Sequence, residues 1–138
     1  MADYFTHFSC ILDVGSPENA AGALELYNVL ASEDEMADLP SDGFLLSIKP
    51  DHDSGQLWIR DDVSGDPEQV IRFVKRCAAE FGLTGLWGFQ YATTCSQARV
   101  NAFGGGAHAL DLATGETVDW IFSGSWLEIV LAGGDPYA

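Results

Sequence analysis

The stretch GDPEQVIRFVKRCAAEFG, residues 65–82, decides the fold because it predicts a helix with both ends marked. Asp66 is a favoured N-cap residue, Pro67 suits the first helical position, and Gln69 stands where a capping box needs it. The apolar residues keep the i, i+3, i+4, i+7, i+11 spacing of one helix face: Val70, Phe73, Val74, Cys77 and Phe81. Gly82 then supplies a left-handed stop. We therefore expect a helix from Pro67 to Phe81 with one buried face.

The residues before this helix predict a strand, another helix and a hairpin. Residues 4–14 alternate apolar and polar side chains with the period of two that is typical of a strand. A helix is expected over residues 17–31, because Ser16 offers an N-cap before Pro17 and apolar residues then keep helical spacing. Two short apolar runs, 44–49 and 56–60, flank a stretch rich in turn formers and predict a hairpin.

A fourth strand is predicted at residues 86–91, where aromatic side chains alternate with small or polar ones. The order strand, helix, strand, strand, helix, strand is that of the ferredoxin-like βαββαβ fold, with two helices on one face of an antiparallel sheet. We therefore expect an α+β protein. Residues 1–138 should form a single domain, with this core in residues 1–92 and an extension in residues 93–138.

The extension is expected to hold a C-terminal β-hairpin formed by residues 107–112 and 116–122. The sequence pattern does not show which type of secondary structure the apolar segment 123–131 forms. Gly104-Gly105-Gly106 is expected to be a mobile connector between the core and the hairpin. It is not expected to bind phosphate, because a P-loop needs a following Lys and a Ser or Thr that opens a helix.

Nucleophilic catalysis would have to use Cys95 or Ser96 with His108 as the base, since no other nucleophile and imidazole are plausibly spaced. The sequence does not show whether these side chains meet. Neither a nucleophile elbow nor papain-like surroundings are present. We therefore expect that the protein is not an enzyme.

Metal binding is not indicated either. Carboxylates cluster around the predicted hairpin at Asp51, Asp53, Asp61 and Asp62. An EF-hand does not fit them, because Gly55 comes one position early and the Glu that ends such a loop is missing. His7, His52 and His108 are scattered, without the ligand spacing of a zinc site. We expect no metal and no cofactor.

Acidity is the main feature that bears on a partner. The chain has 21 Asp and Glu against six Lys and Arg, a net charge of −15, and 15 of these acids lie in residues 1–68. Such a field repels nucleic acid and membranes and attracts basic protein grooves. The hydrophobic share of 47% excludes an acidic disordered tail, so a folded body must display the acids.

The acids of the first half fall at predicted loops and element ends. Those expected to contact a partner are Glu33, Asp34, Glu35, Asp38, Asp42, Asp51, Asp53, Asp61, Asp62 and Asp66. A stripe of carboxylates could imitate duplex DNA, which carries about one negative charge per 1.7 Å of axis. Such a stripe would compete with nucleic acid for a groove lined by Lys and Arg.

The second predicted helix carries a row of basic residues, Arg72, Lys75 and Arg76, opposite its apolar face. Such a row is more often the solvated face of an amphipathic helix than a basic patch that binds a ligand. The four tryptophans are expected to lie mostly in the core. A nucleic-acid binder would need a larger basic footprint.

The sequence also bears on location. No apolar run approaches the roughly 18 residues that cross a bilayer, and the first residues lack the basic and apolar regions of a signal peptide. Cys10, Cys77 and Cys95 are odd in number and far apart, which favours reduced thiols. We expect a soluble, cytoplasmic protein.

In size, acidity and compact α+β plan, the chain resembles the small acidic inhibitors of phages and mobile elements, namely anti-CRISPR and antirestriction proteins that mimic nucleic acid. The resemblance implies a non-enzymatic inhibitor that binds a basic nucleic-acid-binding groove of a bacterial defence complex. Two alternatives stay open. One is an immunity or antitoxin-type protein that masks a basic toxin, and the other is an acidic domain that binds a small molecule or assembles with itself, for example as a homodimer.

Overall fold

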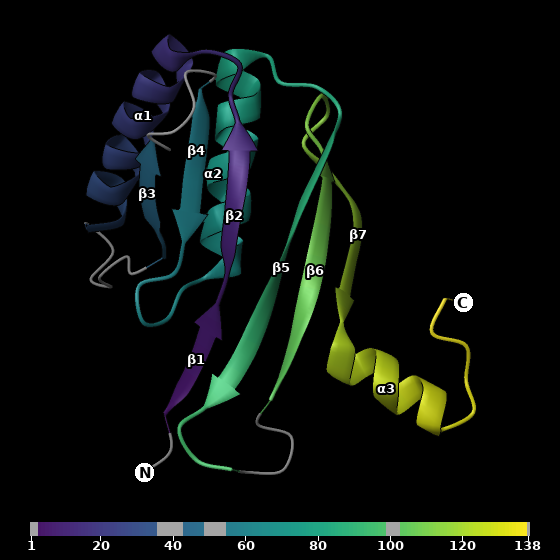
Figure 1. Ribbon diagram of the computed structural model, residues 1–138. Coiled ribbons are helices and arrows are strands. Elements are labelled where there is room, and N and C mark those ends of the chain that lie inside the picture. Colours follow the sequence, from purple (N-terminus) through teal and green to yellow (C-terminus); the bar gives the residue numbers. More distant parts are fainter. Residues whose placement is uncertain (1–2, 36–42, 49–54, 99–102, 138) are drawn as a thin grey trace.

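The computed structural model describes residues 3–35, 43–48, 55–98 and 103–137 and confirms the α+β class (Figure 1). The elements in chain order are β1 (Tyr4–His7), β2 (Ser9–Asp13), α1 (Pro17–Glu35), β3 (Leu45–Ile48), β4 (Gln56–Arg60), α2 (Pro67–Phe81), β5 (Leu86–Cys95), β6 (Gly104–Asp111), β7 (Glu116–Phe122) and α3 (Ser123–Leu131). They form two antiparallel sheets, one with the order β1-β5-β6-β7 and one with the order β2-β4-β3.

The helix α2 begins and ends where the sequence predicts. The Asp66 side chain accepts a hydrogen bond from the Glu68 N–H at 3.0 Å, and Gly82 follows the helix with a φ of 63°. The predicted capping box does not close, because the Asp66 N–H donates to the Gly43 carbonyl at 2.8 Å. Local signals at the two ends were therefore sufficient to place this helix.

The helix α1 starts as predicted but is longer than expected. The Ser16 hydroxyl accepts a hydrogen bond from the Asn19 N–H at 3.1 Å, which caps the first turn. The helix was expected to end near Ala31, yet it continues to Glu35. Acids lower helix propensity only slightly and no Gly or Pro interrupts this stretch, so the helix runs on through residues 32–35.

The expectation of one continuous sheet is wrong, because the predicted strand over residues 4–14 divides at Phe8. The part before Phe8, β1, pairs with β5, whereas the part after it, β2, pairs with β4. The Phe8 N–H donates to the Asp61 carboxylate instead of to a strand carbonyl. The first strand therefore changes its neighbour at one residue, and the two sheets meet there.

The core lies between the two long helices and the β2-β4-β3 sheet and reaches the inner face of β5 and β6 (Figure 1). Its buried members belong to one cluster that includes Leu12, Val14, Leu57, Ile59, Val70, Phe73, Val74, Phe89 and Leu110. Three rings join the helices: Tyr27 of α1 and Phe73 of α2 both pack on Phe44, at centroid distances of 5.1 and 5.3 Å. Both helices thus pack into the same apolar interior.

The larger sheet extends beyond the helices through β5, β6 and β7 (Figure 1). The predicted strand 86–91 continues to Cys95, past the expected core boundary. β6 pairs with both β5 and β7, so these strands continue the sheet of β1 instead of standing apart from it. The segment 123–131, whose type the sequence pattern did not decide, is the helix α3.

The glycines expected to form a mobile connector are instead the first residues of β6. Gly106 lies opposite Tyr91, and a Cβ at this glycine would lie 2.5 Å from the Tyr91 hydroxyl oxygen. That hydroxyl accepts a hydrogen bond from Trp120 Nε1 at 3.0 Å. Glycine is needed here because an aromatic side chain covers the strand, an arrangement that also stabilises a glycine-rich strand.

Gly55 and Gly115 both have left-handed backbone, and comparing them tests how closely the chain approaches Gly55. Gly55 has a φ of 79° and a Cβ there would collide with the Ser16 backbone, whereas Gly115 has a φ of 75° and open space where a Cβ would lie. Both Gly→Ala changes cost about 1 kcal/mol for the left-handed backbone. We expect Gly55→Ala to lose a further 1–3 kcal/mol, roughly, from the collision. Urea unfolding of both variants measures the difference, and equal losses would contradict the close approach at Gly55.

Candidate functional site

The structure places six of the ten acids that were predicted to contact a partner in named segments of the fold. Glu33, Asp34 and Glu35 lie in the last turn of α1, and Asp61, Asp62 and Asp66 lie between β4 and the start of α2. The other four, Asp38, Asp42, Asp51 and Asp53, lie outside the described residues. The six therefore belong to two separate segments of the chain.

The acids at the end of α1 stand where a helix disfavours them. Residues 33–35 are at its C-terminus, and the last turn of α1 carries no basic residue. The carbonyl end of a helix has a partial negative charge, so an acid there destabilises the helix by about 0.3–1 kcal/mol. Three consecutive acids therefore oppose the stability of the helix to which they belong.

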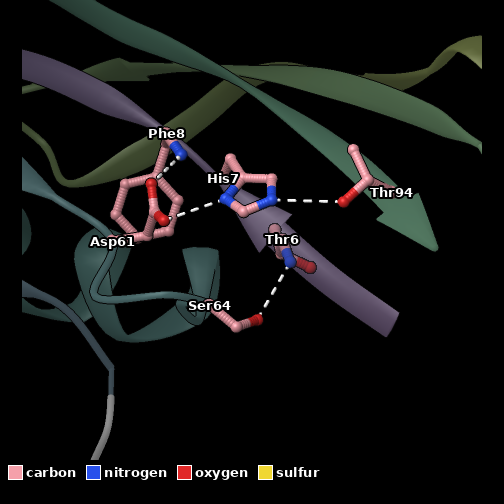
Figure 2. A network of polar contacts seen from close by, with 6 residues as sticks. All are labelled: Thr6, His7, Phe8, Asp61, Ser64 and Thr94. Carbon is pink, nitrogen blue, oxygen red and sulfur yellow. Dashed lines mark hydrogen bonds and ion pairs between the residues drawn. The ribbon is translucent and has the colours of Figure 1, made fainter. Parts of the chain in front are cut away.

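Asp61 has a different role, because its carboxylate holds the point where the two sheets meet (Figure 2). One oxygen, Oδ1, accepts a hydrogen bond from the Phe8 N–H at 2.9 Å, and Oδ2 lies 2.9 Å from His7 Nδ1. The Asp61 N–H donates in return to the Phe8 carbonyl at 3.1 Å. The other ring nitrogen, His7 Nε2, lies 3.1 Å from Thr94 Oγ1 of β5. One carboxylate thus connects β4, the β1-β2 junction and, through His7, β5.

A second pair of bonds supports the same junction. The Thr6 N–H donates to Ser64 Oγ at 2.9 Å, as Figure 2 shows, and the Thr6 carbonyl accepts from the Gly65 N–H at 2.9 Å. Gly65 must be a glycine because a Cβ there would lie 2.6 Å from the Phe8 ring. The segment between β4 and α2 is therefore fastened to β1 along its length.

The order of carboxylate, imidazole and hydroxyl in Asp61, His7 and Thr94 is also that of a hydrolase triad. Sequence reasoning missed this constellation, since its three members are far apart in the chain. Thr94 lies inside β5, paired with Phe5 of β1, whereas such nucleophiles usually stand on a sharp turn that exposes them. We interpret the network as a structural tie between the sheets.

The ionisation of Asp61 reflects these contacts. Partial burial opposes its negative charge, but the hydrogen bond and the positive charge of His7, with the Phe8 N–H, outweigh this effect. The pKa of Asp61 is therefore lower than its ordinary value. The carboxylate stays charged and bound to the fold rather than free for a partner.

Asp66 is also used within the chain, as the N-cap of α2. Asp62 and Asp66 are both exposed, but of these two only Asp66 caps a helix. Of the three acids between β4 and α2, Asp62 is thus the one best placed to meet a partner.

The candidate nucleophile and base do not meet. His108 of β6 lies opposite Phe89, six residues before Cys95 on β5. At about 3.3 Å per strand residue, Cys95 and His108 are about 20 Å apart, and Ser96 is farther still. His108 is 3% exposed, and burial, together with the charge of Lys75, lowers its pKa. The fold therefore keeps Cys95 and Ser96 away from His108.

The remaining candidate chemistry is equally limited. Burial raises the pKa of the Cys10 thiol to about 11 and that of Cys77 to about 12, so both stay protonated near neutral pH.

Among the residues that the structure describes, no three His, Cys, Asp or Glu side chains are grouped to hold a metal ion. In the same part of the chain, no helix has the length and apolar character needed to cross a membrane.

The basic row of α2 lies on the exposed side of the helix. Arg72, Lys75 and Arg76 line a shallow hollow together with Glu68 and Ile71. The opposite side of α2 contributes Phe73, Val74 and other buried residues to the core. This arrangement is that of a solvated face of an amphipathic helix.

An exposed apolar surface is the feature that the sequence reasoning did not foresee. Every residue of β7 and α3, here called the C-terminal arm (residues 116–131), is exposed. The tryptophans were expected to lie mostly in the core, yet Trp58, Trp120 and Trp126 are 39%, 38% and 42% exposed. The expectation failed because apolar content alone does not show whether the fold covers a segment. A signal was present, since the stretch from Trp120 to Leu127 holds no charged residue.

A hollow of about 650 Å³ lies where the arm meets the sheet. Small residues of β6, including Gly105 and Ala107, form part of its wall, and the larger side chains Trp126, Ile129 and Tyr137 form another part. A second hollow of about 470 Å³ shares Gln90, Ala107 and Ile121 with it. The two hollows are thus adjacent on the sheet.

Comparisons with known proteins identify no relative: no family model, no curated protein and no solved structure matches this chain.

The tie made by Asp61 can be tested by substitution. Asp61→Ala leaves the Phe8 N–H and His7 without their acceptor, which we expect to lower the free energy of unfolding by about 1–3 kcal/mol at neutral pH. Because the folded state lowers the pKa of Asp61 below its ordinary value of 3.8, the stabilisation is present above that pH and is lost as the pH falls through the folded-state pKa. The difference in the free energy of unfolding between wild type and Asp61→Ala should therefore become smaller in acid.

Urea unfolding of wild type and Asp61→Ala, from neutral pH down to below pH 3.8, measures this difference. The matched control is Asp62→Ala, which removes an exposed carboxylate next in the chain and should change the stability by less than about 0.5 kcal/mol. If the two variants lost the same stability at every pH, Asp61 would not hold the junction.

Proposed function

We propose that this chain is a non-enzymatic acidic inhibitor that binds a basic nucleic-acid-binding groove of a bacterial defence complex, in the manner of an anti-CRISPR or antirestriction protein that mimics DNA. The observation that carries the proposal is the net charge of −15 on a folded body. Fifteen of its carboxylates cannot be neutralised one for one by Lys or Arg. A charge of this size destabilises the compact state through self-repulsion, so a role in recognition gives a reason for it.

The end of α1 is the preferred contact site within this proposal. Glu33, Asp34 and Glu35 add negative charge at the carbonyl end of their own helix, whose last turn holds no basic residue. Residues kept at a cost to stability are often those that function requires. Asp62 is a second contact candidate, whereas Asp61 and Asp66 serve the fold first.

We infer that the scaffold is a variant of the ferredoxin-like plan. In support, β5, β1 with β2, β4 and β3 are neighbours in that order, as in a βαββαβ sheet, with two helices between them in sequence. The variation is that the first strand divides at Phe8 and that β6 and β7 widen the sheet beyond β5. In this plan, the end of α1 adjoins a connection and the segment that leads into α2 forms another, and binding residues commonly lie in connections.

An immunity protein that masks a basic toxin would use the same electrostatics. Competition separates the two proposals. An inhibitor that occupies a nucleic-acid groove must be displaced by excess duplex DNA, whereas masking of a toxin surface outside such a groove is insensitive to it.

Charge changes at the end of α1 test the proposed contact. We expect the triple variant Glu33→Gln, Asp34→Asn, Glu35→Gln to be more stable than wild type by about 0.5–2 kcal/mol, because it relieves the helix dipole. The same variant should bind a partner purified from the native host at least about tenfold more weakly. Chemical unfolding and calorimetric titration measure the two effects.

The matched control is the triple variant Asp3→Asn, Glu25→Gln, Glu80→Gln, which removes the same charge from exposed positions elsewhere. It should leave the affinity within about threefold of wild type. Equal weakening by both variants would show that net charge, and not the end of α1, governs binding. Binding that excess duplex DNA does not reduce would rule out groove mimicry.

A further inference from the structure

The C-terminal arm has the composition of an interior but the exposure of a surface. Its helix α3 has no buried residue, although Trp126, Leu127, Ile129, Val130 and Leu131 are all large and apolar. Their exposed fractions range from 39% to 77%. A helix that is hydrophobic on most sides is normally enclosed by other protein. Figure 1 shows α3 projecting from the end of β7, away from α1 and α2.

The face of the sheet beside α3 is also unusual for a solvated surface. In register, Gly88, Gln90 and Ala92 of β5 lie beside Ala109, Ala107 and Gly105 of β6, and Ile121 of β7 continues the row. The opposite face carries the large side chains Phe89, Tyr91, His108 and Leu110, which are buried. The outward face of an antiparallel sheet is normally polar, whereas this one, here called the smooth face, carries mainly small or apolar residues, with the Asp119 carboxylate beside Ala109. Small side chains of this kind let another protein surface approach closely.

The exposed apolar area available to one contact approaches that of a stable interface. Strand alternation places Ile121 on the same face as Ala107, whereas Trp120 and Phe122 lie on the opposite face, where Trp120 contacts His108 and donates to the Tyr91 hydroxyl. The apolar residues left for the contact are exposed by 39–77%: Ile121 and, on α3, Trp126, Leu127, Ile129, Val130 and Leu131. With side-chain areas of about 150–250 Å² for the large ones, they present about 500–600 Å². A standard protein interface buries about 800 Å² on each partner. This estimate excludes Tyr137, which adds to the surface at 82% exposure.

Charge indicates what the partner is. Residues 103–138 contain five acids and no Lys or Arg, and the run from Trp120 to Leu127 contains no charge. A basic partner would gain its affinity at the acidic segments and would find no charge to pair with in this run. For two copies that each carry −15, the uncharged run is a surface where they can meet with little repulsion.

The free edge of β7 is less suited to contact with a second copy than the outward face of the sheet is. The Trp120 N–H donates to the Asp119 carboxylate at 2.8 Å, so it is not available to an added strand. A carboxylate on an edge strand is a common device against edge pairing. The contact therefore uses the smooth face and α3.

We propose that a second copy of this chain covers the C-terminal arm, so that the two arms and the smooth faces of β5, β6 and β7 pack together around a twofold axis. The contact is isologous, since each copy offers the same surface. The dimer carries two acidic bodies on one apolar centre. This assembly does not depend on the function proposed above, because it uses none of the acids assigned to that function.

Sedimentation velocity and light scattering of the full chain, from about 1 µM to about 200 µM, test the assembly. We expect a species of twice the 14.9 kDa chain mass whose share rises with concentration. Its dissociation constant should fall when NaCl rises from about 0.1 M to about 0.5 M, because salt screens the repulsion between two acidic copies. Contact with a basic partner would have the opposite dependence on salt.

Two arm variants locate the contact. Ile121→Glu on the smooth face and Leu127→Glu on α3 should each weaken the dimer by at least about 30-fold, since the twofold axis places each new charge in the interface twice. The control is Val29→Glu on α1, because Val29 and Ile121 are both 51% exposed. All three residues are exposed, so circular dichroism should show folded variants.

The outcomes decide the proposal. A chain that stays monomeric at every concentration and at both salt levels would overturn it. A dimer that Val29→Glu weakens as much as the arm variants, or that the arm variants leave intact, would also overturn it.

Discussion

The fold depends on one constraint, the change of partner at Phe8. Its ring is buried against Phe89 at a centroid distance of 6.0 Å, while both of its backbone groups bond to Asp61. A strand that leaves one sheet for another would otherwise expose unpaired backbone groups in the interior, which is costly. Asp61 supplies both partners, and His7 extends the connection to β5. The two sheets can therefore diverge without losing hydrogen bonds at the junction.

That divergence separates two kinds of surface. The β2-β4-β3 sheet and its helices form the well-buried body, whose connections and helix ends carry acids such as Glu33 and Asp62. The β5, β6 and β7 strands leave this body and end in α3, where exposed apolar residues gather. The acidic body suits a basic partner through electrostatic attraction, and the apolar arm suits a second copy through burial of nonpolar area. The two proposed contacts can coexist because they use different parts of the chain.

The parts of the fold that were predicted correctly have strong local causes. The ends of α2 follow from Asp66, Pro67 and Gly82, and the start of α1 follows from Ser16. The failures have non-local causes. The glycines 104–106 form a strand because they pair with β5, with the Tyr91 side chain over Gly106. No short stretch of sequence shows that Asp61 would meet His7 and Phe8. Of the predicted contact acids, local reasoning could not tell Asp61, which bonds within the fold, from Asp62, which is exposed.

Composition and spacing alone were sufficient for the α+β class, the amphipathic helix α2 and the net charge of −15, because each depends on residue type and local periodicity. The three-dimensional contacts settled the division of the first strand, the separation of Cys95 from His108 and the exposure of the C-terminal arm. The physical reason is the same in each case. Whether a side chain is buried, paired or exposed depends on which distant segment lies beside it, and that is decided when the sheets are assembled.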